Sequence, residues 1–239
     1  MEELFRLLKK GVTASHVVDY VKKDLLKNQF QELNIEDEWE LKKNSGYYVN
    51  LYGSGCVAFR TGEHIDDFPA FRIAMAHSDF PCFQIKPNPM VKGRYCARLN
   101  VEIYGGMYQK SWIDRPLGVA GRVVIKGKTV FTPQVLLYKS DRPLCIIPSL
   151  AIHMDKELNK KGALETAKEL VPLAALSEEE DLLSNVADSL NIQTSDILDY
   201  DLYLYNMDVP VVAGLDSSML AAPRLDNLTS VGSILHGIK

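Results

Sequence analysis

The chain has 239 residues, 46% of them hydrophobic, so it is long enough and apolar enough to bury a globular core. Its formal net charge is −4, with acidic and basic residues interspersed, which argues against a nucleic-acid partner because no basic excess is left to neutralise a phosphate backbone. No apolar run reaches membrane-spanning length and the N-terminus lacks the pattern of a secretory signal, so we expect a cytoplasmic protein with no membrane partner.

The first predicted element is an amphipathic helix over residues 13 to about 30. Thr13 or Ser15 is suited to cap its start, because a side-chain oxygen there accepts a hydrogen bond from a free backbone N–H. Its inward face is predicted from apolar residues at helical spacing, which are Val17, Val18, Val21, Leu25 and Leu26.

Short β-prone runs come next. Residues 47–51 and 56–60 flank the turn sequence GSG at 53–55, a spacing and composition that predict a hairpin. Residues 71–76 form an apolar run that we expect to be a buried strand. Residues 92–138 are rich in β-branched and aromatic residues interrupted by glycines, which is typical of a small barrel or sandwich.

The last third of the chain mixes helices and strands. Residues 162–190 have a helical pattern, and SEEE at 177–180 fits a capping box at the start of a second helix. Residues 201–205 and 210–213 resemble strands, and residues 227–239 the opening turns of a helix. A strand-rich middle between two mixed segments suggests one domain inserted into another, with boundaries near 88 and 208.

A histidine and an aspartate end the apolar run FRIAMAHSD at residues 71–79. In a strand, the side chains of His77 and Asp79 would lie on the same side. His77 would then bind a metal while the Asp79 carboxylate orients its ring and raises its basicity. From the local pattern alone, an ordinary hydrogen-bonded pair where a strand meets a loop is the favoured explanation, and the metal interpretation is the minority one.

Asp226 and His153 are further candidates, and each has a plain alternative. Asp226 lies between a strand-like region and a helix start, where it would bridge two metals or simply cap the helix. His153 follows an apolar stretch and would, on local grounds, be a core histidine.

Several common motifs are absent from the sequence: GxSxG, HExxH, the phosphate-binding P-loop and GxGxxG. The four cysteines are widely spaced with no CxxC pair, which argues against a disulfide framework and against a thiolate zinc site. We therefore expect reduced thiols.

Seven short blocks, in order, resemble the M18 metallopeptidases (aspartyl aminopeptidase-like). AHSDFP at 76–81 is similar to the family's AHTDSP, with Ser78 in place of Thr and Phe80 in place of Ser. The other blocks are KP at 86–87, VEIYGG at 101–106, WIDR at 112–115, AGRV at 120–123, IPSLAIH at 147–153 and RLDN at 224–227. The resemblance runs from about residue 47 to 239, and the first forty residues carry little of it.

The resemblance implies a two-zinc aminopeptidase acting on peptide substrates. In it His77 ligates one zinc, Asp226 bridges both, and Asp79 orients the His77 ring. The family's IPxLAIH histidine reaches the neighbouring subunit's site and stabilises the developing oxyanion, so His153 would act in trans. A water held between two cations has a lowered pKa and attacks the carbonyl that a zinc ion polarises.

The same resemblance implies an α/β fold: a zinc-peptidase α/β core, incomplete here, interrupted by an inserted β-rich, barrel-like dimerisation domain. Residues 1–87 would be the N-terminal part of the peptidase domain and residues 88–208 the inserted domain. Residues 209–239 would return to the peptidase domain, truncated. We expect a homo-oligomer formed through the inserted domain.

The sequence departs from the family after its RLDN block. The family has a glutamate pair there, then a further carboxylate and a late histidine, whereas residues 227–239 contain no carboxylate. Because a catalytic zinc normally needs three protein ligands, we expect this polypeptide to bind metal weakly and to be inactive alone. The alternative is a truncated, non-catalytic assembly or interaction protein that retains the dimerisation domain. A third hypothesis keeps the metal site but assigns other amide substrates.

Overall fold

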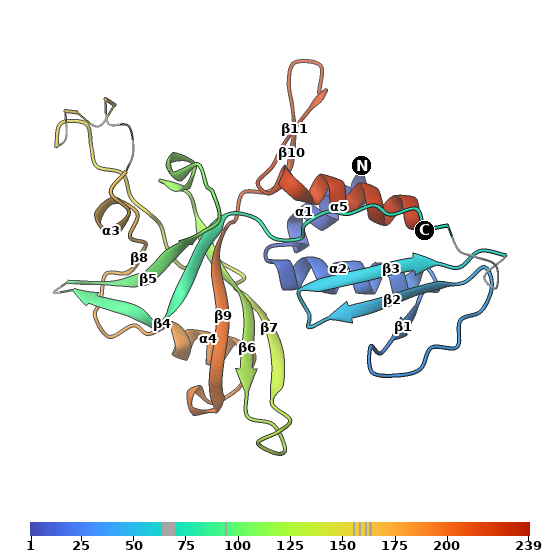
Figure 1. Ribbon diagram of the computed structural model, residues 1–239. Coiled ribbons are helices and arrows are strands. Elements are labelled where there is room, and N and C mark those ends of the chain that lie inside the picture. The colour runs from blue at the N-terminus through green and yellow to red at the C-terminus, as the bar shows by residue number, and fades with distance from the viewer. Residues whose placement is uncertain (64–69, 94, 155, 158, 161, 163) are drawn as a thin grey trace. The chain divides into compact units, whose positions relative to one another are not determined.

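The computed structural model describes residues 1–63, 70–93, 95–154, 156–157, 159–160, 162 and 164–239 (Figure 1). These residues form two compact units. The first combines Met1–Phe80 with Val209–Lys239, and the second is Pro81–Asp208. Each unit has its own buried core, so each is described by itself.

Three helices build the first unit: α1 (Glu2–Lys10), α2 (Ala14–Lys27) and α5 (Leu225–Ile238). The predicted helices at 13–30 and 227–239 are confirmed, and of the two candidate caps Thr13 is used, accepting the His16 N–H at 3.4 Å. The pattern analysis did not predict α1. Its charges favour a helix, because acidic residues occupy its first turn and lysines its last.

A small sheet completes this unit. β2 (Gly46–Leu51) pairs antiparallel with β3 (Gly55–Arg60), which confirms the predicted hairpin, and parallel with β1 (Gln31–Leu33). A two-stranded hairpin, β10 (Val211–Ala213) with β11 (Met219–Ala221), confirms the strand predicted at 210–213. Helices α1 and α5 lie side by side (Figure 1). One core cluster joins them to α2 and to the end of the first segment through Leu7, Leu8, Val17, Phe80 and Leu228.

The prediction of a buried strand at residues 71–76 is wrong. The segment has no strand structure, and the side chains of Phe71, Ile73 and Met75 are 79%, 80% and 87% exposed. Apolar composition signals a tendency to be buried but does not specify the partner. Here the described part of the chain does not cover these side chains.

Six antiparallel strands form the sheet of the second unit, in the order β7-β6-β9-β4-β5-β8. The strands are β4 (Cys82–Gly93), β5 (Cys96–Tyr104), β6 (Leu117–Ile125), β7 (Gln134–Lys139), β8 (Leu173–Ala175) and β9 (Ile197–Asn206). Within the described residues β7 and β8 are the two edges and do not pair with each other, so the sheet is open. The β-rich middle is confirmed, whereas a closed barrel is not observed.

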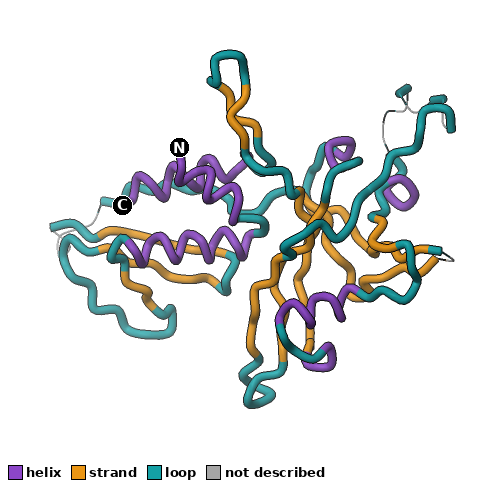
Figure 2. Tube along the Cα trace, turned by 180° about the vertical axis from the view of Figure 1, so that it is seen from behind, coloured by secondary structure: helices purple, strands orange, loops and turns teal. Residues whose placement is uncertain are grey.

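Short helices accompany this sheet: η1 (Gln109–Trp112), α3 (Thr166–Glu169), α4 (Leu182–Leu190) and η2 (Thr194–Asp196). The helical prediction for 162–190 is right for α3 and α4 but misses β8 between them, and Ala163 lies outside the described residues. The cap of α4 is Asp181, which accepts the Ser184 N–H at 2.9 Å, so the predicted box at Ser177 is wrong. Figure 2 shows α4 along one face of the sheet, where Leu182 and Val186 join the core. In the part of the chain that is described, no helix combines the length and the apolar character needed to cross a bilayer.

The AGRV block lies in β6, and its glycine has a steric role. Gly121 has φ +153° and packs directly against the β9 backbone. A Cβ at this position would overlap the carbonyl oxygen of Asp201. A side chain is therefore excluded where β6 and β9 approach, in the middle of the sheet.

We expect Gly121→Ala to lower the free energy of unfolding by at least about 2 kcal/mol, because backbone must move to admit the methyl group. Urea denaturation followed by circular dichroism measures this change. The control is Gly106→Ala, whose added Cβ would lie in open space and should cost within about 0.5 kcal/mol. Equal stability of the two variants would contradict the packing described.

Candidate functional site

The structure brings His77 and Asp226 together within the first unit. His77 Nε2 lies 3.3 Å from Asp226 Oδ1. His77 ends the exposed segment that precedes the second unit, and Asp226 stands at the start of α5. The two side chains are 53% and 92% exposed, so solvent and small ions reach them.

Asp79 occupies the other side of the His77 ring. His77 Nδ1 lies 2.9 Å from the backbone carbonyl oxygen of Asp79 and 3.3 Å from its carboxylate Oδ1. Both of these atoms are acceptors, so Nδ1 carries a proton and donates. The nearer partner is the carbonyl rather than the carboxylate named by the sequence prediction.

This arrangement leaves two acceptors facing each other. With the proton on Nδ1, the neutral ring presents the Nε2 lone pair to the Asp226 carboxylate, which also only accepts. A cation between them removes the conflict, and that cation is either a proton, which makes the ring an imidazolium, or a metal ion.

The same arrangement favours a protonated His77 ring, which is seen in a raised pKa of His77. Its pKa is raised, first by the hydrogen bond to the Asp79 backbone, against an opposing contribution from partial burial, and then by the negative charges of Asp79 and Asp226. A raised folded-state pKa means that the imidazolium stabilises the fold fully below the unfolded-state pKa. That contribution disappears as the pH rises through the folded-state pKa.

The two segments are held by one core. Phe80 is buried beside Leu228 in the same cluster, which fixes the chain just after His77 and just after Asp226. The guanidinium of Arg224 lies 5.8 Å from the centre of the Phe80 ring and donates to the Leu8 carbonyl oxygen at 2.9 Å. The substituted residue of the AHSDFP block therefore contacts the arginine of the RLDN block.

Asp226 lies outside the regular part of α5. Asp226 and Asn227 both have non-helical backbone angles, and the peptide bond between them is cis. The Asp226 carboxylate is directed at the His77 ring. The cap position of α5 is Arg224 rather than Asp226, so the helix cap that the local pattern left open for Asp226 is not observed.

His77 and Asp226 are side chains of the types that bind metal ions, but the described residues form no complete metal cage. They contain no group of three or more His, Cys, Asp or Glu side chains placed to hold a metal ion. None of the four cysteines, at positions 56, 82, 96 and 145, forms a disulfide in the structure. Imidazole nitrogen and carboxylate oxygen are both zinc ligands.

His153 lies in the second unit, in an exposed turn. Its neighbours Leu150, Ile152 and Met154 are also exposed, at 52%, 49% and 69%. The alternative of a core histidine is therefore wrong. The sequence did not reveal a contact that lies just before this turn, in which Oδ1 of Asp114 in the WIDR block accepts the Ser149 N–H at 2.9 Å.

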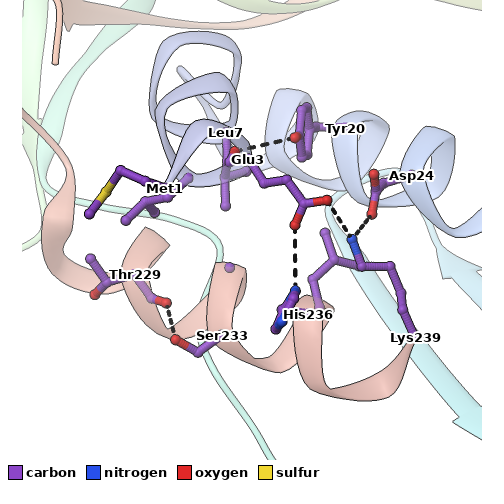
Figure 3. A pocket seen from close by; sticks show the side chains of 12 residues that line it. Met1, Glu3, Leu7, Tyr20, Asp24, Thr229, Ser233, His236 and Lys239 are labelled. Atoms are coloured by element: carbon purple, nitrogen blue, oxygen red, sulfur yellow. Dashed lines mark hydrogen bonds and ion pairs between the residues drawn. The ribbon is translucent and has the colours of Figure 1, made fainter.

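A separate cavity of about 260 Å³ lies between α1, α2 and α5 (Figure 3). Lys239 spans its wall, with its Nζ 2.8 Å from Asp24 Oδ2 and 3.3 Å from Glu3 Oε1. Burial alone would lower the pKa of Lys239, but its bonds to Asp24 and Glu3 raise it overall. The Lys239 ammonium group and the carboxylates of Glu3 and Asp24 therefore neutralise one another at the cavity wall.

We expect Asp79→Asn and Asp226→Asn each to lower the pKa of His77, since each removes a negative charge that favours the imidazolium. NMR titration of the His77 ring in the metal-free chain measures the shift. Asp19→Asn, which alters only an exposed pair with Lys23, should leave the His77 titration unchanged. An unchanged midpoint in both site variants would show that neither carboxylate acts on the ring.

Comparison with known proteins agrees with the sequence blocks. The family model described as "Aminopeptidase I zinc metalloprotease (M18)" matches residues 7–239. The "Probable M18 family aminopeptidase 2" of Clostridium novyi is 37% identical, over 99% of this chain and 56% of that protein. "Aspartyl aminopeptidase 4" of Saccharomyces cerevisiae is 32% identical, over 99% of this chain and 54% of that protein.

Solved structures lead to the same family. The chain in "Cryo-EM structure of the Ape4 and Nbr1 complex" superposes with a TM-score of 0.93 at 27% identity, over 98% of this chain and 49% of that one. The chain thus spans about half the length of the relatives it matches. With nearly every residue inside the family match, the chain belongs to the M18 family of zinc metalloproteases.

Proposed function

We propose that this chain is part of a zinc-dependent aminopeptidase that removes N-terminal residues from peptides. Family membership supports the reaction class, and the observation that carries the site is the facing pair of acceptors, His77 Nε2 and Asp226 Oδ1. Two ligands of one tetrahedral zinc, each about 2.0–2.2 Å from the metal, lie about 3.3–3.6 Å apart. The 3.3 Å separation of these atoms fits that spacing.

Each site residue has a distinct part. His77 Nε2 would hold a zinc ion and the Asp226 carboxylate would be a ligand shared by two, while Asp79 holds the His77 ring by accepting from Nδ1, which fixes the tautomer and raises the basicity of Nε2. When bound, zinc supplies a Lewis acid for the peptide carbonyl and lowers the pKa of water. His153 acts in a neighbouring subunit, where its ring donates to the developing oxyanion.

The two compact units of the structure correspond to a peptidase domain and a dimerisation domain in this proposal. We assign residues 1–87 and 209–239 to the peptidase domain and residues 88–208 to a β-rich dimerisation domain through which copies of the chain associate. The division of the structure at Phe80 and Asp208 supports this assignment. The exposed apolar side chains beside His153 support contact with another copy. The four cysteines form no disulfide, which supports a cytoplasmic location.

The 239-residue polypeptide on its own is proposed to be inactive. Its described residues offer two donors, whereas a catalytic zinc normally has three protein ligands and a water. The exposed apolar run at residues 71–76 supports the same conclusion, because a peptidase core would cover it. The competing function is a truncated, non-catalytic assembly or interaction protein that retains the dimerisation domain.

The test compares the product of the complete gene with the 239-residue chain. Zinc content and release of amino acids from peptides with N-terminal Asp, Glu or Leu are measured for both. We expect turnover from the complete product only. His77→Ala and Asp226→Asn should abolish it, and Asp79→Asn should weaken zinc affinity by about 10–100-fold.

His236→Ala is the matched control, since this exposed histidine of α5 contacts Glu3 rather than the site. It should keep full zinc content and turnover. Turnover that persists in His77→Ala would contradict the assigned site. Oligomers that form without zinc and without turnover would favour the assembly protein.

A further inference from the structure

The loop that carries His153 has a fixed base. Ile147 is fully buried and forms a parallel bridge with Ile113. The Asp114 backbone N–H donates to the Ile147 carbonyl oxygen at 2.9 Å. On the other side of the segment, Ile146 and Leu173 exchange two backbone hydrogen bonds of 3.1 and 2.8 Å. The chain is therefore anchored up to Ile147.

Asp114 extends this anchor past Pro148. Its carboxylate Oδ1 accepts the Ser149 N–H at 2.9 Å. Pro148 has no N–H to contribute, so the next donor along the chain is that of Ser149. Asp114 therefore holds the segment on both sides of the proline, with its backbone before it and its side chain after it.

The backbone of Asp114 suits this double contact. Its φ is +58°, a left-handed conformation that Asp, Asn and Gly adopt far more readily than other residues. The pKa of its carboxyl is lowered by the hydrogen bonds from Ser149, so the acceptor is ionised and strong at neutral pH. The neighbouring Arg115 pairs with Asp208 at 2.7 Å instead and leaves the Asp114 carboxylate to Ser149.

Beyond Ser149 the loop is exposed. Leu150 and Ile152 are half exposed, and the turn at 151–154 is closed by the Met154 N–H donating to the Ala151 carbonyl oxygen at 2.8 Å. His153 sits in that turn, four residues past the last contact with Asp114. The turn that holds His153 therefore begins two residues after Ser149, the last residue bonded to Asp114.

We propose that Asp114 is a positioning residue: by clamping Ile147 and Ser149 it fixes the loop that presents His153. The proposal rests on the function proposed for His153. Asp114 itself touches neither substrate nor metal and acts through the loop.

Hydrogen exchange of the 239-residue chain, followed by mass spectrometry over residues 147–154, tests the clamp. Asp114→Gly removes the carboxylate and tolerates the positive φ, so it isolates the side-chain bond. We expect the Ser149 amide to exchange about tenfold faster or more, as loss of a charge-assisted bond predicts. Asp114→Asn keeps an acceptor oxygen and the backbone preference, and should restore protection to within about threefold of wild type.

Asp196→Gly is the matched control, because it removes a half-exposed carboxylate whose ion-pair partner is Lys126 rather than a residue next to Asp114, and it should not change exchange at Ser149. Circular dichroism checks that each variant folds. If Asp114→Gly does not fold, Asp114→Ser replaces it, because the shorter serine side chain cannot make the same hydrogen bond to Ser149 N–H. Wild-type exchange in Asp114→Gly, or failure of Asn to rescue, overturns the clamp. His153→Ala tests the catalytic role of His153 separately from the contact between Asp114 and the loop. Full turnover of this variant in the complete gene product would overturn the role of His153, whereas slow exchange at Ser149 in the same variant would leave the role of Asp114 in the loop intact.

Discussion

The candidate site depends on one hydrogen bond, from His77 Nδ1 to the backbone carbonyl of Asp79. That bond decides which ring nitrogen carries the proton, and so decides that the other nitrogen faces Asp226 as an acceptor. A carboxylate and an imidazole lone pair at this separation need a cation between them. The same geometry therefore explains a raised His77 pKa without metal and a ligand pair with metal.

Packing brings these groups together from distant parts of the chain. Phe80 and Leu228 share one core cluster, and Arg224 lies over the Phe80 ring while bonding the end of α1. Because Phe80 and Leu228 are buried only a few residues from His77 and Asp226, the exposed side chains of His77 and Asp226 cannot move far apart. Asp114 applies the same principle in the second unit, where a buried Ile147 and a clamped Ser149 precede an exposed His153.

Local patterns predicted much of the fold because the relevant interactions are local. The hairpin at 46–60 follows from its turn residues, and the start of α2 from Thr13. The strand predicted at 71–76 failed because composition does not name a packing partner, and the cap of α4 shifted because Asp181 also offers an oxygen beside the first turn.

The site itself was reached by resemblance rather than by pattern. Nothing local distinguished a ligand at Asp226 from a helix cap, and neither spacing nor composition reveals that its carboxylate meets His77. The clamp at Asp114 was also missed, because its partners lie more than thirty residues away. Such contacts become visible only once the chain is folded, although an aspartate just before an Arg-Pro turn is a signal for a special backbone position.

The most direct measurement is anomalous X-ray scattering at the zinc edge from crystals of the complete gene product. The account predicts a zinc peak about 2.0–2.2 Å from His77 Nε2 and from an Asp226 carboxylate oxygen, with Nδ1 still bonded to Asp79. Zinc bound elsewhere, with the side chains of His77 and Asp226 turned away from each other, would contradict it.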